Sequence, residues 1–294
     1  ILFYLSYNLA AFSYLWTNKP DLVYAVDLDS ILAARTIKLL RPGTKMIFDA
    51  HEHFTEVPEL KNSPLKKKIW KAVANWNIPR VDLCLTVGPS LAEIFSDQYD
   101  RAFHVVRNTP IINHGPEVEY QAEKKVLLYQ GMLNEGRGLE VLVDAMEELQ
   151  DWTLWLVGSG DIAQTLKEHA KKSKASDRIV FHGFVEPDEL PAFTQQATLG
   201  LNLLVAESLS YYYSLANKTF DYMACGLPAI HMDFPEYREI QEKYYCFLLL
   251  DKLEKRSLVK LIHQTDSPQL MKLHQNNLEA AQHFQWKMES EKFK

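Results

Sequence analysis

Short apolar runs alternate with longer amphipathic stretches through most of this chain, and this alternation constrains the fold more than any other feature. In the first half, strand-like and helix-like patterns follow one another at 21–26, 28–40, 45–50, 64–77, 81–87, 89–99 and 102–106. Strands that alternate with helices form parallel sheets with helices on both faces. Ligands bind such sheets at the carboxyl ends of the strands, so candidate site residues are sought there.

The second half repeats the same plan. Its strand-like and helix-like patterns lie at 126–130, 139–149, 153–157, 179–182, 187–197, 199–204, 229–232, 235–243 and 247–250. A chain of 294 residues suits two domains better than one. The fold class predicted from the pattern is therefore α/β, with two Rossmann-like, doubly wound parallel sheets.

The N-terminal stretch 1–16 is strongly apolar, but it is shorter than the ~20 residues that a membrane-spanning helix needs. It also lacks the basic start and the cleavage site of a signal peptide. We expect a buried amphipathic helix. With no initial Met, the sequence is expected to begin within a larger domain.

Charge and cysteine content exclude some classes of protein. The formal net charge is −6, which argues against general nucleic-acid binding. Cys84, Cys225 and Cys246 show no metal-ligand spacing and are interpreted as buried thiols in a reducing compartment. We therefore expect a cytoplasmic protein.

Residues 217–228 predict a short helix with a defined start and end. Asn217 suits the N-cap, because its side chain can accept a hydrogen bond from a free backbone N–H. Gly226 suits the left-handed position just past the helix, and Pro228 blocks its continuation.

Two charged residues lie on one face of this helix. Lys218 falls in the first turn, where a cation is unfavourable unless an anion binds in front of it. Asp221 follows three residues later and could accept hydrogen bonds from a sugar diol. A solvated Lys–Asp pair explains the pattern equally well.

The loop 131–138 follows a predicted strand and precedes a predicted helix. Such a glycine-bearing loop can hold a phosphate, but the loop matches neither Gly-x-Gly-x-x-Gly nor the P-loop pattern. Arg137 is therefore the candidate phosphate ligand, because a guanidinium donates two parallel hydrogen bonds.

Asp49, His51 and His53 come at the end of a predicted strand and would point the same way in an extended chain. Three interpretations stay open. A metal site would need more ligands than this stretch supplies. A structural role would place these side chains in a turn at the strand end. A functional role would place His51 in a substrate cleft.

The predicted helix within 63–80 is both basic and apolar. Its lysines interleave with Ile69, Val73 and Trp76, which follow helical spacing and are expected to form its apolar face. Such helices can rest on anionic membrane surfaces, but ordinary amphipathic surface helices have the same pattern.

The stretch around the 217–224 helix resembles the donor-binding helix of retaining, nucleotide-sugar-dependent family-4-type glycosyltransferases of the GT-B fold (glycosyl transferases group 1). The matching residues are Tyr211, Ser214, Asn217, Lys218, Phe220, Tyr222, Met223, Ala224, Gly226 and Pro228. Ala216 stands where the family has proline, and Asp221 where it has glutamate. The loop resembles the family through Gly131, Leu133, Arg137 and Gly138.

Other positions depart from the family pattern. Met132 stands where many members have a second basic residue, and Tyr213 stands where most have a glutamate. The glycine-rich loop that normally follows the first strand of the family is absent.

The resemblance assigns roles to residues of this chain. Arg137, Lys218 and His51 are the expected catalytic residues, with His51 contacting the donor sugar. The expected substrate-binding residues are Glu52 near the acceptor, Phe184 and Val185 at the base, Gly131, Gly138, Tyr213, Ser214, Asn217 and Asp221.

The resemblance also implies a domain plan. We expect an N-terminal, acceptor-side Rossmann-like domain at 1–108 that lacks its first strands, a linker at 109–125, a nucleotide-sugar-binding domain at 126–270, and C-terminal helices at 271–294. Two facing domains of this kind are the GT-B architecture.

The implied activity is transfer of a sugar from a nucleoside diphosphate to a glycan or lipid-linked acceptor with retention of configuration, as in polysaccharide biosynthesis. No metal or further cofactor is required in that scheme. Contact with the inner face of a membrane through 63–80 would suit a lipid-linked acceptor. A sugar-nucleotide epimerase and a non-catalytic nucleotide-sugar-binding protein are the alternatives.

Overall fold

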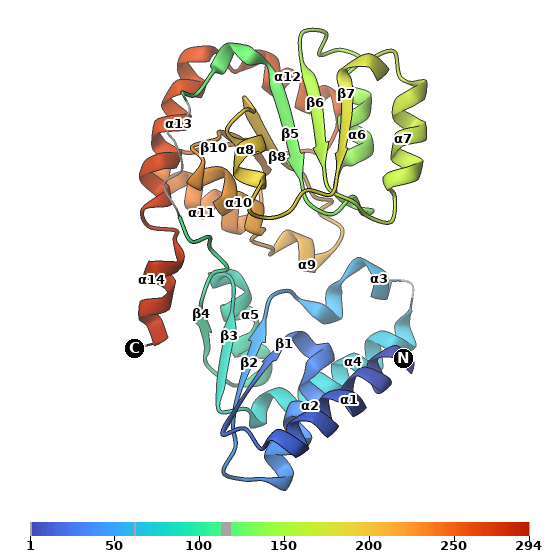
Figure 1. Cartoon of the computed structure of the whole chain (residues 1–294), viewed down its shortest axis with the longest axis vertical. Coiled ribbons are helices and arrows are strands. Elements are labelled where there is room, and N and C mark those ends of the chain that lie inside the picture. The colour runs from blue at the N-terminus through green and yellow to red at the C-terminus, as the bar shows by residue number, and fades with distance from the viewer. Residues whose placement is uncertain (1, 62, 113–118, 294) are drawn as a thin grey trace. The chain divides into compact units, whose positions relative to one another are not determined.

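A computed structural model describes residues 2–61, 63–112 and 119–293 of the chain. Its contacts divide the chain into two compact units (Figure 1). Unit 1 comprises Ile1–Arg107 and Glu207–Ser214, and unit 2 comprises Asn108–Ala206 and Leu215–Lys294. Part of the expected linker, residues 113–118, lies outside the described residues.

Unit 1 contains a four-stranded parallel sheet in the order β1-β2-β3-β4. Its elements are α1 (Leu2–Asn18), β1 (Leu22–Val26), α2 (Asp27–Leu40), β2 (Lys45–Ala50), α3 (Pro58–Lys61), α4 (Pro64–Asn77), β3 (Leu83–Thr86), α5 (Pro89–Tyr99), β4 (Phe103–Val105) and α9 (Leu209–Tyr212). The core gathers buried side chains from β2, α2 and α5, including Met46, Ile37 and Leu91. The predicted alternation of strands and helices is thus present in this unit.

Unit 2 contains a six-stranded parallel sheet in the order β10-β9-β8-β5-β6-β7. Its elements are β5 (Val126–Gln130), α6 (Leu139–Ala145), β6 (Thr153–Val157), α7 (Ala163–Lys172), β7 (Ile179–Gly183), α8 (Leu190–Thr194), β8 (Leu199–Asn202), α10 (Asn217–Ala224), β9 (Ala229–Met232), α11 (Pro235–Tyr244), β10 (Phe247–Leu250), α12 (Lys255–Gln264), α13 (Ser267–Ala281) and α14 (Trp286–Ser290).

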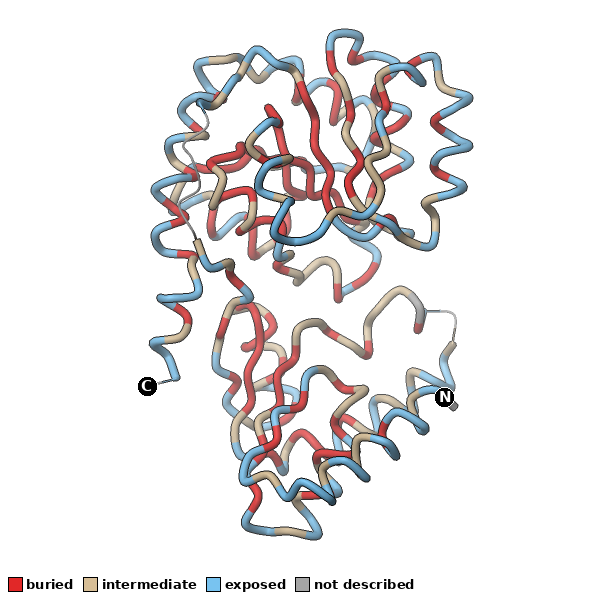
Figure 2. Tube along the Cα trace, in the orientation of Figure 1, coloured by how far each residue is buried: buried red, intermediate tan, exposed pale blue. Residues whose placement is uncertain are grey.

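The central strand of this sheet is covered on both faces. Every residue of β5 is buried (Figure 2), although successive side chains of a strand point to opposite faces of the sheet. α6 packs against α7 and α12, whereas α10 packs against α8 and α13. The strand order reverses between β5 and β8, which are neighbours in the sheet although β6 and β7 lie between them in the chain. α10 follows β8 after a long connection. Ligands of open parallel sheets bind at such reversals.

One expectation about the helices of unit 1 was wrong. The helix at the N-terminus is not buried: Phe3, Leu9 and Tyr14 of α1 are 74%, 60% and 68% exposed. In α4, Trp76 is 65% exposed. Trp70 instead packs on the core, edge-on to Tyr4 and Phe54. Helical spacing identified an apolar stripe, but it did not show which stripe meets the sheet.

Candidate functional site

Two glycine loops of unit 2 pack against each other at the carboxyl ends of β5 and β6. Gly131 directly follows β5 and has φ of 127°, and Gly158 follows β6 with φ of 139°. A Cβ on Gly158 would lie 1.9 Å from the carbonyl oxygen of Gly131, so only glycine fits there. Leu133 N–H also donates to the Ser159 carbonyl at 2.8 Å. The β5–α6 loop is therefore held close to the β6–α7 loop.

Gly138 ends the β5–α6 loop in the left-handed conformation, with φ of 66°, and begins α6. A Cβ at this position would lie 2.9 Å from the Cβ of Leu203. The residue is buried, so its role in the fold is close packing of the loop on the end of β8. Arg137, its neighbour, is half-buried.

The helix that the sequence analysis singled out is α10, but its cap differs from the expected one. The N-cap is Ala216, with φ of −72° and ψ of 137°, and no side chain caps the helix. Asn217 is the first helical residue and is exposed, so its predicted capping role was wrong. Gly226 has φ of 64° just past the helix, as predicted.

The body of α10 is fixed to the sheet by Tyr222. The Tyr222 hydroxyl lies 3.3 Å from the carbonyl oxygens of Leu128 and Leu201, and it accepts from the Gln130 N–H at 3.4 Å. Its ring lies against Gly200, where a Cβ would be 2.8 Å from ring atoms. Strands β5 and β8 therefore set the position of the helix.

Lys218 is buried, which the sequence did not predict. The residue is 8% exposed, and its Nζ lies 3.7 Å from the centre of the Tyr129 ring. Within the described residues, this Nζ has no hydrogen-bond partner. A Cβ on Gly131 would be 3.3 Å from Nζ, so glycine there lets the lysine lie against the loop.

The electrostatics of Lys218 connect it with Arg137 and Asp221. Burial lowers the pKa of Lys218 well below its usual range, the positive charge of Arg137 lowers it further, and the carboxylate of Asp221 opposes both effects. Burial raises the pKa of Asp221 to about 6, against the opposing influence of nearby Gln130 and of Lys218. The structure thus brings together the two predicted cations and the predicted carboxylate in one unit.

Phe184 and Val185 follow β7 in the same unit. Gly183 has φ of 76°, and its carbonyl oxygen accepts from the Gly158 N–H at 2.7 Å. Phe184 is 65% exposed, while Val185 packs against a core cluster that also contains Tyr222. The two residues therefore face different surroundings, with only the Phe184 ring open to solvent.

In unit 1, His51 is held by a carboxylate. Its Nε2 lies 3.0 Å from Asp49 Oδ2, which also accepts from the Tyr24 hydroxyl at 2.5 Å. The backbone N–H of His51 donates to Asp27 Oδ1 at 2.9 Å. The hydrogen bond with Asp49 raises the pKa of His51. The imidazole keeps 36% of its side chain exposed, so it can still contact a ligand.

His53 does not point the same way as His51. It is 7% exposed and lies edge-on to Phe95 in the core, and burial lowers its pKa. The predicted alternation fails because β2 ends at Ala50, before either histidine.

Asp27 and Tyr24, at this end of the sheet, were not predicted from the sequence. Asp27 is the first residue of α2 and has φ of 54°, which is unusual for a residue other than glycine. The sequence did contain one sign that Asp27 lies at a strand end, because this residue directly follows the apolar run 22–26. The bond from Tyr24 could not be foreseen, because it depends on the pairing of β1 with β2.

Residues 207–214 belong to unit 1, although they lie between β8 and α10 in the chain. Ser208 Oγ donates to the Glu56 carbonyl at 2.9 Å, and Ser210 Oγ lies 3.4 Å from Glu52 Oε2. Tyr213 packs against the core of unit 1, and Ser214 Oγ donates to the Tyr211 carbonyl at 2.8 Å.

Comparisons with known proteins bear on this geometry. Residues 124–264 match the family model described as glycosyl transferases group 1. HepE of Anabaena, solved in complex with UDP and glucose, has a TM-score of 0.79 and 16% identity, over 96% of this chain and 79% of that chain. Sucrose-phosphate synthase of Thermosynechococcus elongatus has a TM-score of 0.78 and 17% identity, over 98% and 75%.

The fold is GT-B. This confirms the fold class predicted from the sequence, and the family match confirms the resemblance to glycosyl transferases group 1 over residues 124–264. A curated relative, an uncharacterized glycosyltransferase of Methanocaldococcus jannaschii, is 27% identical over 122 residues. That match covers 40% of this chain and 30% of the relative, so it spans less than a third of that protein. Arg137, Lys218 and Asp221 all lie within the family match.

Two features are absent from residues 2–61, 63–112 and 119–293, the part of the chain that the structure describes. No group of three or more His, Cys, Asp or Glu side chains in these ranges is arranged to hold a metal ion. Every helix in the same ranges is too short or too polar to span a bilayer. The three cysteines are free thiols, two of them buried.

Proposed function

We propose that this chain is a glycosyltransferase that binds a nucleoside-diphosphate sugar through unit 2. The observation that carries the proposal is the buried amino group of Lys218, 8% exposed and without a hydrogen-bond partner in the described residues. Burying a charged group without an anion is costly. A diphosphate bound at this position would supply the missing negative charge.

The chemistry of sugar transfer explains why two cations would lie together. Cleavage of the bond between the anomeric carbon and the donor oxygen places negative charge on the departing diphosphate. Preorganised cations that meet this charge in the transition state lower the barrier. Arg137 would donate two parallel bonds to it and Lys218 would act as a point charge.

Asp221 is proposed to bind the ribose. Its carboxylate is half-buried beside Lys218 and could accept hydrogen bonds from two hydroxyl groups. Hydroxyl donors favour the ionised form, so donor binding would lower its pKa from about 6. We further propose that configuration is retained and that the departing phosphate takes the proton of the acceptor, so no side chain is named as general base.

On unit 1, His51 is the group that we assign to sugar hydroxyls. Its imidazole is partly exposed and held by Asp49. An imidazole oriented in this way presents a fixed donor or acceptor to a hydroxyl group. The role of Glu52 near the acceptor is proposed on the same basis, because it lies next to His51 in the chain and is only half-buried.

The donor proposed for a first test is a UDP-sugar, because HepE was solved with UDP and glucose. We propose a glycan or lipid-linked acceptor, and a reaction in which Arg137 and Lys218, rather than a required metal ion, neutralise the diphosphate. Leu65, Ile69 and Trp76 on α4 are exposed and lie beside exposed Lys66 and Lys68. This surface supports contact with an anionic membrane.

The test is calorimetric titration of the protein with UDP, GDP and ADP, followed by turnover assays with the glucose derivative of the tightest ligand, with and without EDTA. Arg137→Met removes the guanidinium and should weaken diphosphate binding by about 30-fold, as expected for a lost hydrogen bond to a charged group. Lys255→Met, a surface lysine of the same unit, is the matched control and should bind as the wild type does.

Three results separate the candidate functions. Binding with transfer or slow donor hydrolysis supports a glycosyltransferase. Binding without any turnover supports the non-catalytic alternative, which the exposed Met132 in the β5–α6 loop favours, since an apolar side chain there adds no charge toward a diphosphate. Failure of the wild-type protein to bind any of the three diphosphates refutes the proposal.

A further inference from the structure

The backbone N–H of Ala216 is bonded to a side chain from another helix. No side chain of the local sequence caps α10, yet the Ala216 N–H donates to the Tyr237 hydroxyl at 3.2 Å. Helix N-termini leave free N–H groups that need partners. Tyr237, on α11, is fully buried and provides one of these partners at the start of the helix that carries Lys218.

Tyr237 is itself held by the sheet. The Asn202 side-chain amide donates to the Tyr237 hydroxyl at 2.9 Å and lies 3.1 Å from Nδ1 of His231. Asn202 ends β8 and is the register partner of His231 on β9. Asn202 and His231 are 1% and 0% exposed.

Ring stacking completes this arrangement. The His231 ring is stacked on that of Tyr237, with centroids 4.6 Å apart and planes at 23°, and it also contacts the Phe247 ring, with centroids 4.1 Å apart. Burial, followed by the nearby charge of Lys218, lowers the pKa of His231 to about 3, so the imidazole is neutral. A neutral ring beside the lysine adds no further positive charge to the site.

Ala216 makes the connection possible. The pattern that this stretch resembles has a proline at that place, and a proline has no N–H to donate. The backbone angles of Ala216, φ −72° and ψ 137°, are ones that proline also adopts. Alanine at this position therefore adds a hydrogen-bond donor at the start of α10. The backbone conformation there suits alanine and proline alike.

We propose that Asn202, Tyr237 and the Ala216 N–H form a positioning network that sets where α10 presents Lys218 to the diphosphate. The inference rests on the proposed function and adds positioning residues to it. Asn202, at the end of β8 beside β9, is hydrogen-bonded to the buried Tyr237 hydroxyl. The same hydroxyl is bonded to Ala216, which lies two residues before Lys218. Small displacements of a charged group in a preorganised site weaken its interaction strongly.

The experiment is a set of UDP titrations on folded variants at a temperature well below unfolding. Tyr237→Phe keeps the ring and its stacking but removes the hydroxyl that accepts from both Asn202 and the Ala216 N–H. It should weaken UDP binding about tenfold, because the start of α10 loses the hydrogen bond that fixes a charged contact. Ala216→Pro removes the donor of the same bond without changing the core, and it should weaken binding to a similar degree. Tyr244→Phe, on the same helix, is the matched control and should bind UDP normally.

Double mutants test whether the network acts through the lysine. Tyr237→Phe added to Ala216→Pro should cause no further loss of UDP affinity, because both substitutions remove the bond between the Ala216 N–H and the Tyr237 hydroxyl. Tyr237→Phe added to Lys218→Met should also leave UDP affinity unchanged, whereas a general loss of stability would weaken binding in both backgrounds. Normal UDP affinity of Ala216→Pro and Tyr237→Phe would overturn the positioning role. Wild-type protein that binds no diphosphate would instead refute the proposed function, and the inference with it.

Discussion

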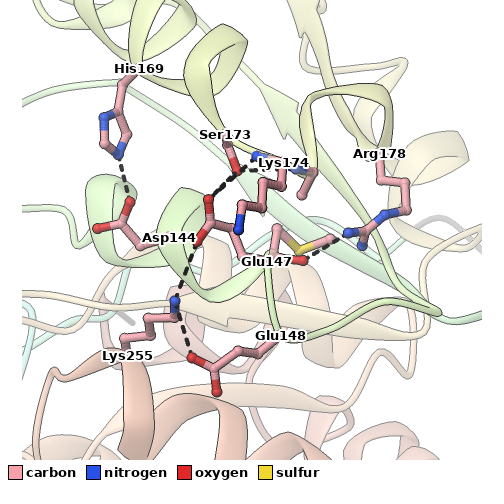
Figure 3. Close-up of polar contacts among 10 residues, drawn as sticks. Asp144, Glu147, Glu148, His169, Ser173, Lys174, Arg178 and Lys255 are labelled. Atoms are coloured by element: carbon pink, nitrogen blue, oxygen red, sulfur yellow. Dashed lines mark hydrogen bonds and ion pairs between the residues drawn. The ribbon is translucent and has the colours of Figure 1, made fainter.

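Two groups of polar side chains in unit 2 surround their lysines in opposite ways: one lysine lies beside carboxylates, and the other lies on an aromatic ring beside a second cation. The first, which we call the α6 cluster, consists of Asp144, Glu147, Glu148, His169, Ser173, Lys174, Arg178 and Lys255 (Figure 3). Lys255 Nζ lies 3.1 Å from Glu148 Oε1 and 3.7 Å from Glu147 Oε2, and the hydrogen bond with Glu148 raises its pKa. In the second group, Lys218 lies on an aromatic ring beside another cation, and its pKa falls.

Arg178 shows how a cation serves the fold alone. Its guanidinium donates to the carbonyl oxygens of Leu149 at 2.6 Å, Trp152 at 3.1 Å and Met146 at 3.0 Å. These carbonyls follow the end of α6, where free C=O groups need donors. The fold therefore explains this arginine fully, and no ligand has to be invoked.

The contrast teaches how to tell a structural charge from a functional one. In the α6 cluster, charged side chains contact oppositely charged side chains or backbone carbonyl groups. Each of these contacts stabilises the protein slightly. At α10, the buried lysine lowers stability, because its amino group has lost water without gaining a hydrogen-bond partner in the described residues. Residues that lower stability in the absence of a ligand are typical of functional sites.

The largest effect is expected from Lys218→Met, which keeps the length of the side chain and removes its charge. UDP affinity should fall by about 100-fold, since the lysine would make a charge-assisted bond with the diphosphate. The melting temperature should rise, because the variant no longer buries an amino group that lacks a hydrogen-bond partner in the described residues. Calorimetric titration and thermal unfolding of the same samples measure both. Unchanged affinity, or a large fall in melting temperature, would contradict the functional interpretation of this lysine.

A smaller effect, on pH dependence, is expected from Asp221→Asn. The pKa of Asp221 in the folded protein is about 6, above its ordinary value of 3.8. The folded state therefore binds the proton more tightly than the unfolded state does, so Asp221 favours folding below pH 3.8. This contribution is lost as pH rises through about 6, where the buried carboxylate becomes ionised.

The asparagine variant cannot ionise, so its stability should lack this decline. Its melting temperature relative to the wild type should increase between pH 4 and pH 7, in the absence of ligand. Melting curves of both proteins across that range measure the difference. A constant difference at every pH would show that Asp221 does not titrate in this window.

The sequence predicted the local parts of this site well. The alternation of strands and helices, the end of α10 at Gly226 and the place of Arg137 in the β5–α6 loop all depend on residues close together in the chain. Lys218 and Asp221 could be assigned to one helix for the same reason. These predictions needed only backbone preferences and the spacing of apolar residues.

Features that depend on packing between distant segments were not predictable. The ring of Tyr129 lies against Lys218 because β5 lies beside the start of α10, and the sequence contains no sign of this contact. His53 turns into the core because β2 ends early. The exposed side of α1 was unexpected, because the helix has apolar residues on all of its sides. Their spacing alone does not select the face that is buried.

The smallest effect is expected from Lys255→Met, the counterpart of Lys218→Met in the α6 cluster. The lysine side chain is 34% exposed, and solvent-exposed ion pairs contribute little to stability. The melting temperature should change by about 1 °C, with less difference from the wild type at high salt, because salt screens exposed charges. UDP affinity should stay at the wild-type value. Thermal unfolding at low and high salt, with titration of the same protein, provides the comparison. If this substitution weakened UDP binding as much as Lys218→Met does, the loss would reflect the net charge of unit 2, and the distinction between partnered and buried cations would fail.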